Sequence, residues 1–259
     1  MSGILEARSV SVNFGGLAAL KQVEFSLAEG QIVGLIGPNG AGKTTMFNCL
    51  SGFLTPTSGD VLFGGASITH LAPHQITALG MARTFQTSRV FKRMTVMEHL
   101  LVGAHLHQRT GLWAAVVRPG WVEREEDETR ARGRKTLEYF GEDLLPYLDD
   151  YADTLSYANK RRLEIARALV AEPKLLLLDE PTAGMNPHES AEVVQLMRTI
   201  QRAGVTVLLI EHDMKVIMGV SDRIVVLDHG EKIAEGLPEE IRKNEDVIHA
   251  YMGRRHASA

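Results

Sequence analysis

The stretch 37-GPNGAGKT-44 decides the fold of this 259-residue chain. It spells the phosphate-loop pattern G-x-x-x-x-G-K-T, directly after the apolar run Val33–Ile36 and before a helix that opens at Thr45. Glycines let successive backbone amides point into one concavity, and the N-terminus of the helix adds a positive dipole end. We therefore expect a site for nucleotide phosphates, with Lys43 reaching the outer phosphates and the Thr44 hydroxyl offered to Mg²⁺. The expected binding residues are Pro38, Asn39, Gly40, Ala41, Gly42, Lys43, Thr44 and Thr45.

The pattern of strand, glycine loop and helix extends outward from this stretch. Apolar runs at Lys174–Leu178 and Val205–Ile210, separated by a helix pattern, predict a mainly parallel core sheet flanked by helices. Before the phosphate loop, β-like segments at Ile4–Val12 and Val23–Leu27 are broken by turn residues. They predict an N-terminal antiparallel β subdomain. Together with the phosphate loop and the parallel sheet, the pattern predicts an α/β fold with a P-loop NTPase core.

A helical lobe is expected between Gln86 and Leu155, where strand signals disappear. Thr95 and Glu98 have the spacing of a capping box. The charged run Glu123–Lys135 is typical of a solvated helix, with a partner-contact surface as the alternative. We predict one domain over 1–259, with the helical lobe at about 87–158 and a C-terminal tail at about 236–259.

Composition excludes several classes of protein. The net charge of -4 offers no basic footprint for nucleic acid. The apolar runs are far shorter than the roughly 20 residues that cross a bilayer, and the N-terminus lacks the basic and apolar regions of a secretory signal. The single cysteine cannot form an internal disulfide. We expect a cytoplasmic chain.

Two carboxylates follow the apolar run Lys174–Leu178, where the carboxyl ends of parallel strands bind ligands. We expect Asp179 to hold Mg²⁺ through water and Glu180 to act as the general base on the attacking water. A strand that simply ends in charged residues is the alternative. His212 follows the run Val205–Ile210 and reaches the same edge, where it can touch a terminal phosphate; an incidental histidine is the alternative.

These motifs, in this order, resemble the ABC transporter ATPase family. The stretches NFGGL, IGPNGAGKTT, ARTFQ, RRLEIARAL, AGMNP, LLIEHDM and NEDVIHAYMG most resemble the ATPase of the high-affinity branched-chain amino-acid importers. The resemblance implies the ABC ATPase fold, with ATP and Mg²⁺ bound. It implies that Phe14 stacks on adenine, although a core phenylalanine is the alternative, and that Gln86 senses Mg²⁺ and the attacking water. Asn186 stands where many members of the family have an aspartate.

The family works as a head-to-tail dimer, in which the Ser156 region of one chain caps the nucleotide of the other. Here Leu155 and Ser156 are followed by Tyr157, Ala158 and Asn159, where the family commonly has two glycines and glutamine. Ala158 replaces a glycine that permits close backbone approach. We hypothesise that the nucleotide site completed by this segment is weaker than the site of the chain's own phosphate loop.

The function implied is an ATPase that powers import of leucine, isoleucine and valine. The implied partners are two transmembrane permease subunits, a second homologous ATPase subunit or a second copy of this chain, and indirectly an extracytoplasmic amino-acid-binding protein. The chain would then lie on the inner face of the membrane through the permeases. The alternatives are the ATPase of another ABC system such as lipopolysaccharide export, a soluble non-transport ABC ATPase, and a regulatory module without turnover. The presence of Glu180 disfavours the last.

Overall fold

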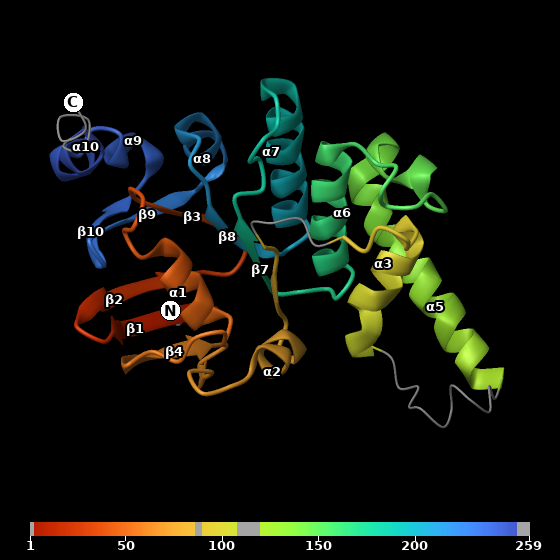
Figure 1. The fold of residues 1–259 in the computed structure, drawn as a ribbon, viewed down its shortest axis with the longest axis horizontal. Helices are drawn as coiled ribbons and strands as arrows, with labels where there is room; N and C mark the ends of the chain where they lie inside the picture. Colours follow the sequence, from red (N-terminus) through yellow and green to blue (C-terminus); the bar gives the residue numbers. More distant parts are fainter. Residues whose placement is uncertain (1–2, 86–89, 108–119, 253–259) are drawn as a thin grey trace.

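A computed structural model of the protein describes residues 3–85, 90–107 and 120–252, and in this part of the chain two β-sheets form the framework (Figure 1). The central sheet has the strand order β10-β9-β3-β8-β7-β6 and is parallel except for the antiparallel pair β10-β9. Its strands are β3 (Ile32–Ile36), β6 (Met81–Arg83), β7 (Leu175–Asp179), β8 (Thr206–Ile210), β9 (Arg223–Asp228) and β10 (Glu231–Gly236).

The second sheet is antiparallel and has the order β2-β1-β4-β5. It contains β1 (Leu5–Phe14), β2 (Leu17–Leu27), β4 (Ser58–Phe63) and β5 (Ala66–Ser67). The predicted N-terminal antiparallel subdomain and mainly parallel core are therefore confirmed. The strands β4, β5, β6, β9 and β10 were not predicted.

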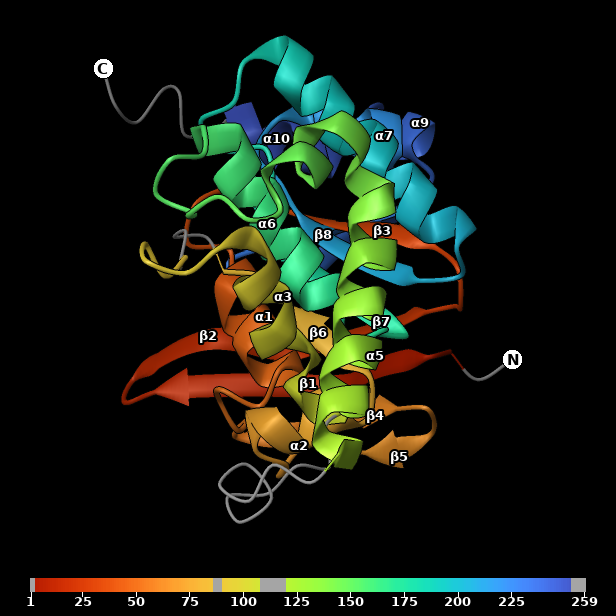
Figure 2. The ribbon, with the colours of Figure 1, turned by 90° about the vertical axis from the view of Figure 1, so that its right-hand side faces the viewer.

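Helices cover both faces of the central sheet. The helices are α1 (Lys43–Leu50), α2 (Pro73–Ala78), α3 (Val96–Gly103), α5 (Gly120–Leu137), α6 (Tyr157–Leu169), α7 (Pro187–Arg202), α8 (Met214–Val220), α9 (Pro238–Ile241) and α10 (Glu245–Met252), with 3₁₀ turns η1 (Ala104–His107), η2 (Glu138–Asp143) and η3 (Leu145–Tyr147). In Figure 1, α3, α5 and α6 lie on the right and β1 and β2 on the left. Figure 2 turns the right-hand side toward the viewer, so α3, α5 and α6 lie in front of the sheet.

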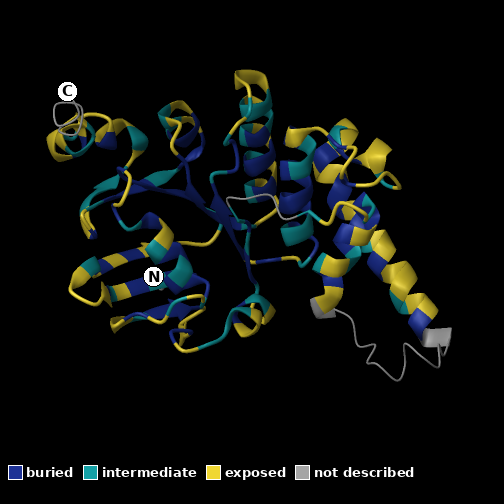
Figure 3. Cartoon of the chain, viewed as in Figure 1, coloured by how far each residue is buried: buried dark blue, intermediate teal, exposed yellow. Residues whose placement is uncertain are grey.

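Alternation along the fully buried strands divides the core between the two faces. In β3, Ile32 and Ile36 belong to the cluster with α6, α7 and α8, whereas Val33 and Leu35 belong to the cluster with α1 and the antiparallel sheet. The central strands are accordingly dark blue in Figure 3. Because β3, β7 and β8 are buried from both sides, their carboxyl ends form a rigid edge on which functional groups can be held.

The expected capping box begins α3. The Thr95 hydroxyl accepts from the Glu98 N–H at 3.2 Å, and the Glu98 carboxylate accepts from the Thr95 N–H at 2.7 Å. The described elements from 90 to 155 are helices and 3₁₀ turns, apart from an isolated bridge between Thr95 and Tyr151. The limits of the lobe at 87 and 158 stay a prediction. Among the described residues, no helix has the length and hydrophobicity to cross a bilayer.

A buried histidine holds the segment that leads into α3. His99 is fully buried, its Nδ1–H donates to the Thr95 carbonyl at 2.8 Å, and its Nε2 accepts from the Phe91 N–H at 2.9 Å. This pattern requires the neutral ring, because a proton on Nε2 would face another donor. Burial lowers the pKa of His99.

We predict that this histidine makes the fold less stable in mild acid. Since the pKa is lower in the fold, the unfolded chain takes up this proton first, so stability is full above the ordinary histidine pKa of about 6.5 and declines below it. The expected slope is up to about 1.4 kcal/mol for each pH unit below that value. Chemical denaturation at pH 7.5 and 5.5 measures it, and His99→Gln should reduce the difference. An equal difference in the variant would contradict the assignment.

Candidate nucleotide-binding and catalytic site

The loop 37–44 forms a cradle between β3 and α1. Lys43 is buried, and its Nζ donates to the carbonyls of Gly37 at 2.7 Å and Pro38 at 3.0 Å, so the ammonium folds back over the loop. Gly42 has a φ of +103°, and a Cβ there would lie 2.8 Å from the Ala19 carbonyl oxygen. Only glycine fits this place, so the loop can pack closely against the Ala19 backbone of β2.

A cleft of about 690 Å³ opens over this cradle. It is large enough for a nucleotide, since ligand pockets commonly measure about 300–1,000 Å³. Its lining joins the phosphate loop to the end of β8 and to residues of β2 and the β9–β10 turn. The lining residues are Leu17, Ala18, Ala19, Lys21, Asn39, Gly40, Ala41, Gly42, Lys43, Thr44, Thr45, Glu180, Ile210, His212 and His229.

Asp179 ends β7 and is buried, with the guanidinium of Arg83 beside its carboxylate. Burial raises the pKa of its carboxyl, while the neighbouring Arg83 guanidinium, 3.4 Å from Oδ2, opposes the rise. Arg83 also donates to Asn48 and Ser51 of the segment that follows the phosphate loop, at 2.8 and 2.7 Å. Arg83 therefore joins the Asp179 carboxylate to α1, the helix that follows the phosphate loop, and the role of Asp179 as a Mg²⁺ ligand stays a prediction.

Glu180 and His212 meet across the ends of β7 and β8. The Glu180 Oε1 lies 2.5 Å from the His212 Nε2, and both residues line the cleft. The buried carboxylate of Glu211 holds the backbone of His212. It accepts from the backbone N–H of His212 at 2.8 Å and from the Thr182 hydroxyl at 2.6 Å. The structure thus brings together Lys43, Thr44, Glu180 and His212, which sequence analysis had placed in one site.

Two further expected site residues, Phe14 and Ser156, do not line the cleft. Phe14 ends β1 and is 52% exposed. The nearby lining residues, beginning at Leu17, belong to β2, after the Gly15–Gly16 turn. Ser156 is exposed and caps α6, where its hydroxyl accepts from the Asn159 N–H at 3.1 Å. Gln86 lies outside the described residues. The roles of all three stay predictions.

The segment Leu155–Asn159, which departs from the family pattern, is buried at Leu155 and Ala158 and exposed at Ser156 and Tyr157. Ala158 is buried, and the ring of Tyr157 covers Gly184, where an added Cβ would lie 3.2 Å from the ring. Asn186, the position where a crossing aspartate is common, caps α7 and accepts from the Glu189 N–H at 3.0 Å.

We predict that this segment limits the rate of ATP hydrolysis at the nucleotide site that it completes in the other subunit. Ala158→Gly with Asn159→Gln should raise the ATP hydrolysis rate of the assembled dimer, because glycine allows closer backbone approach to the phosphates. The rate should rise a few-fold, because one additional hydrogen bond contributes about 1 kcal/mol. Steady-state hydrolysis by variant and unaltered dimers measures it. An unchanged rate would contradict the hypothesis.

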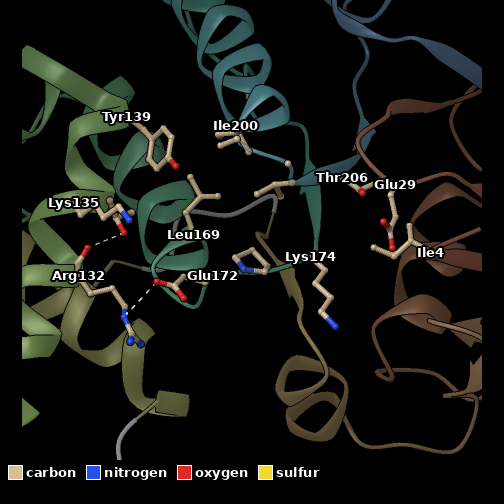
Figure 4. Close-up of a pocket in the computed structure, with 15 residues that line it drawn as sticks. Ile4, Glu29, Arg132, Lys135, Tyr139, Leu169, Glu172, Lys174, Ile200 and Thr206 are labelled. Carbon is tan, nitrogen blue, oxygen red and sulfur yellow. Dashed lines mark hydrogen bonds and ion pairs between the residues drawn. The ribbon is translucent and has the colours of Figure 1, made fainter.

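A second cavity, of about 510 Å³, lies at the opposite edge of the sheet (Figure 4). Lys174 and Thr206, beside the amino ends of β7 and β8, form one wall, and α5 contributes Arg132 and Lys135. Arg132 pairs with Glu172 at 3.5 Å. Ligands of open parallel sheets bind at the carboxyl edge, so this cavity is not the nucleotide site.

Several residues around the site carry no signal in the sequence. His229 and Lys21 line the cleft, and Arg83 and Arg161 contact the end of β7. Both arginines lie in the stretches ARTFQ and RRLEIARAL, which were noted only for their family likeness. An arginine in a helix or a short strand is usually solvated, so no local signal predicts its burial.

Comparisons with known proteins agree with this geometry. The family model described as ABC transporter matches residues 20–183, and the one described as branched-chain amino acid ATP-binding cassette transporter matches residues 231–257. The chain is 46% identical over 251 residues to the high-affinity branched-chain amino acid transport ATP-binding protein LivG of Salmonella typhimurium, covering 96% of this chain and 98% of that protein.

Two of the solved structures with a similar fold bear on the function. One is the ADP conformation of an ATP-binding cassette of an ABC transporter, with a TM-score of 0.84, 32% identity, and coverage of 98% of this chain and 100% of that chain. The other is a dimeric ATP-binding cassette in a post-hydrolysis state bound to ADP and Pi, with a TM-score of 0.74, 25% identity, and coverage of 90% and 98%. The chain belongs to the ABC transporter family, as an ATP-binding ATPase subunit that couples hydrolysis to transport.

Proposed function

We propose that this chain hydrolyses ATP to power import of leucine, isoleucine and valine through an ABC transporter. The observation that carries the proposal is the likeness to the branched-chain amino acid transport ATP-binding protein across 96% of the chain, including the match at 231–257. The chemistry of the site supports the proposal, because the cradle, Asp179 at the end of β7 and Glu180 directly after it lie at one edge of the sheet.

We assign the following roles to the side chains; the positions of Lys43, Thr44, Asp179, Glu180 and His212 support them, and the role of Gln86 rests on the family resemblance alone. Lys43 and the amides of the loop bind the phosphates, and the helix dipole of α1 adds to their attraction. Glu180 accepts a proton from the attacking water, and His212, in contact with Glu180, touches the terminal phosphate. Thr44, Asp179 and Gln86 would hold Mg²⁺, which neutralises charge on the phosphates.

The proposed assembly is a head-to-tail dimer, with a second copy or a homologous ATPase subunit. In it, Ser156 at the N-terminus of α6 faces the nucleotide of the other subunit, where an exposed helix end can bind phosphate. The likeness to a dimeric ATP-binding cassette supports this arrangement. Both nucleotide sites would then be shared between subunits.

A groove of about 330 Å³ is the proposed docking site for the cytoplasmic helices of the permeases. It lies between α2 and β6 on one side and α3 and α6 on the other. Phe53 and Val102 line it and are 55% and 48% exposed, so an apolar helix face can cover them. Docking there would hold the chain on the inner face of the membrane.

Hydrolysis by the reconstituted transporter tests the proposal. The chain is assembled in proteoliposomes with the two permeases and its partner ATPase, and ATP hydrolysis is measured with empty and leucine-loaded binding protein. We expect stimulation by the loaded binding protein. Hydrolysis indifferent to the binding protein would overturn the branched-chain assignment and leave the ATPase assignment standing.

A further inference from the structure

Arg161 of α6 is buried among backbone carbonyls at the catalytic edge. Its guanidinium donates to the Asp179 carbonyl at 2.6 Å, the Glu180 carbonyl at 2.9 Å and the Phe85 carbonyl at 2.6 Å. It also pairs with Glu164, one helical turn along, at 3.0 Å, and both side chains are 2% exposed. A single side chain thus joins α6 to the end of β7 and to the residue that directly precedes Gln86.

This arrangement is specific to arginine. The guanidinium offers five donors in a fixed planar fork, whereas lysine has one nitrogen on a flexible stem. A buried charge is tolerated only where its partners are complete, and here carbonyl oxygens and the Glu164 carboxylate supply them. The contacts therefore fix the positions of the carbonyls as well as the charge.

The backbone at Glu180 needs such a restraint. Its φ is +51°, in the left-handed region that a residue with a Cβ adopts at a cost of about 1–3 kcal/mol and keeps only when its surroundings enforce it. The Glu180 N–H donates to the Ile210 carbonyl at 2.9 Å, and its own carbonyl accepts from Arg161. Hydrogen bonds to β8 and to α6 thereby fix the backbone of Glu180, while its side chain contacts His212.

We propose that Arg161 is a positioning residue for the Glu180 carboxylate. By holding the Asp179 and Glu180 carbonyls, it keeps the strained backbone that directs Glu180 into the cleft beside His212. Ser156 caps the same helix, so Arg161 also links the placement of the base to the helix end that faces the nucleotide of the other subunit in the proposed dimer. The inference rests on the proposed role of Glu180 as general base.

The test separates catalysis from binding. Arg161→Lys keeps a positive charge beside Glu164 but cannot span the carbonyls, so kcat for ATP should fall about 10- to 100-fold, as expected for a base displaced by about 1 Å. The Kd for ATP, measured with a fluorescent analogue, should stay within about threefold, because the phosphate cradle is untouched. A double variant, Arg161→Gln with Glu164→Gln, removes the pair without leaving a buried charge and should show the same division.

Arg162→Lys is the matched control. Arg162 lies next along α6 and is 5% exposed. It pairs with Glu192 at 2.5 Å and Asp143 at 3.4 Å and donates to the Asn159 side chain at 2.8 Å, away from the end of β7. The thermal stability of Arg162→Lys should fall as much as that of Arg161→Lys, whereas its kcat should change by about threefold at most, the effect of one hydrogen bond to Asn159. Equal losses of kcat in both lysine variants, or parallel losses of kcat and ATP affinity in Arg161→Lys, would reduce Arg161 to a structural role and overturn the inference.

Glu180→Gln in the same assay separates the two proposals. If it abolishes hydrolysis while Arg161→Lys and the double variant keep full kcat, the positioning role alone is wrong. If Glu180→Gln hydrolyses ATP normally, the proposed base is wrong and the positioning role falls with it.

Discussion

Glu180→Gln should abolish turnover while leaving ATP binding intact. Glutamine has the shape of glutamate and can stay in contact with His212, but it cannot take a proton from water at neutral pH. A positioned general base contributes roughly 10²- to 10⁴-fold, so kcat should fall by that factor. Steady-state phosphate release measures kcat, and equilibrium binding of a fluorescent nucleotide measures the affinity.

The matched control for this substitution is Glu172→Gln. Glu172 pairs with Arg132 beside the cavity at the amino edge of the sheet, far from the phosphate loop, and its side chain is 62% exposed. Its kcat should equal that of the unaltered chain. If Glu180→Gln also retains its kcat, the attacking water is activated by another group, and the assignment of the base is wrong.

Lys43→Ala should remove most of the affinity for ATP. The ammonium is held over the cradle by the Gly37 and Pro38 carbonyls, so it is already in place when phosphate oxygens arrive. A hydrogen bond to a charged group contributes about 1.5–3 kcal/mol, which corresponds to roughly 10- to 150-fold in Kd. Isothermal titration with ATP and Mg²⁺ measures the loss.

Lys174→Ala controls for a general change of charge. Lys174 is exposed and lies beside the amino end of β7. Its Kd should match that of the unaltered chain. Equal losses of affinity in the two variants would mean that ATP senses the net charge of the protein instead of a contact with Lys43.

The central part of the fold could be predicted because each element carries its own signal. The runs that became β3, β7 and β8 are apolar throughout, as expected for strands buried on both faces, and the phosphate loop marks the junction of β3 and α1. By contrast, β10 reads EKIAEG and is exposed or half-buried along its length, so it has no apolar pattern to find. Its place depends on pairing with β9, a contact that no local pattern encodes.

The same distinction separates the predicted from the missed site residues. Lys43, Asp179, Glu180 and His212 each follow a recognisable strand, so their convergence at one edge could be expected from the parallel sheet. Arg161 sits in a helix with several charged neighbours, and only the packing of α6 against β7 buries it on three carbonyls. Tertiary packing, and not helix chemistry, gives this residue its role.

Uptake of radiolabelled leucine tests the central claim most directly. Proteoliposomes contain the permeases, the partner ATPase and this chain, with ATP inside the vesicles on the side of the ATPase and leucine-loaded binding protein outside. We predict uptake that requires ATP, is lost in Glu180→Gln, and is competed by isoleucine and valine. ATP hydrolysis without uptake of any of these amino acids, by an assembly that contains all its subunits, would contradict the account.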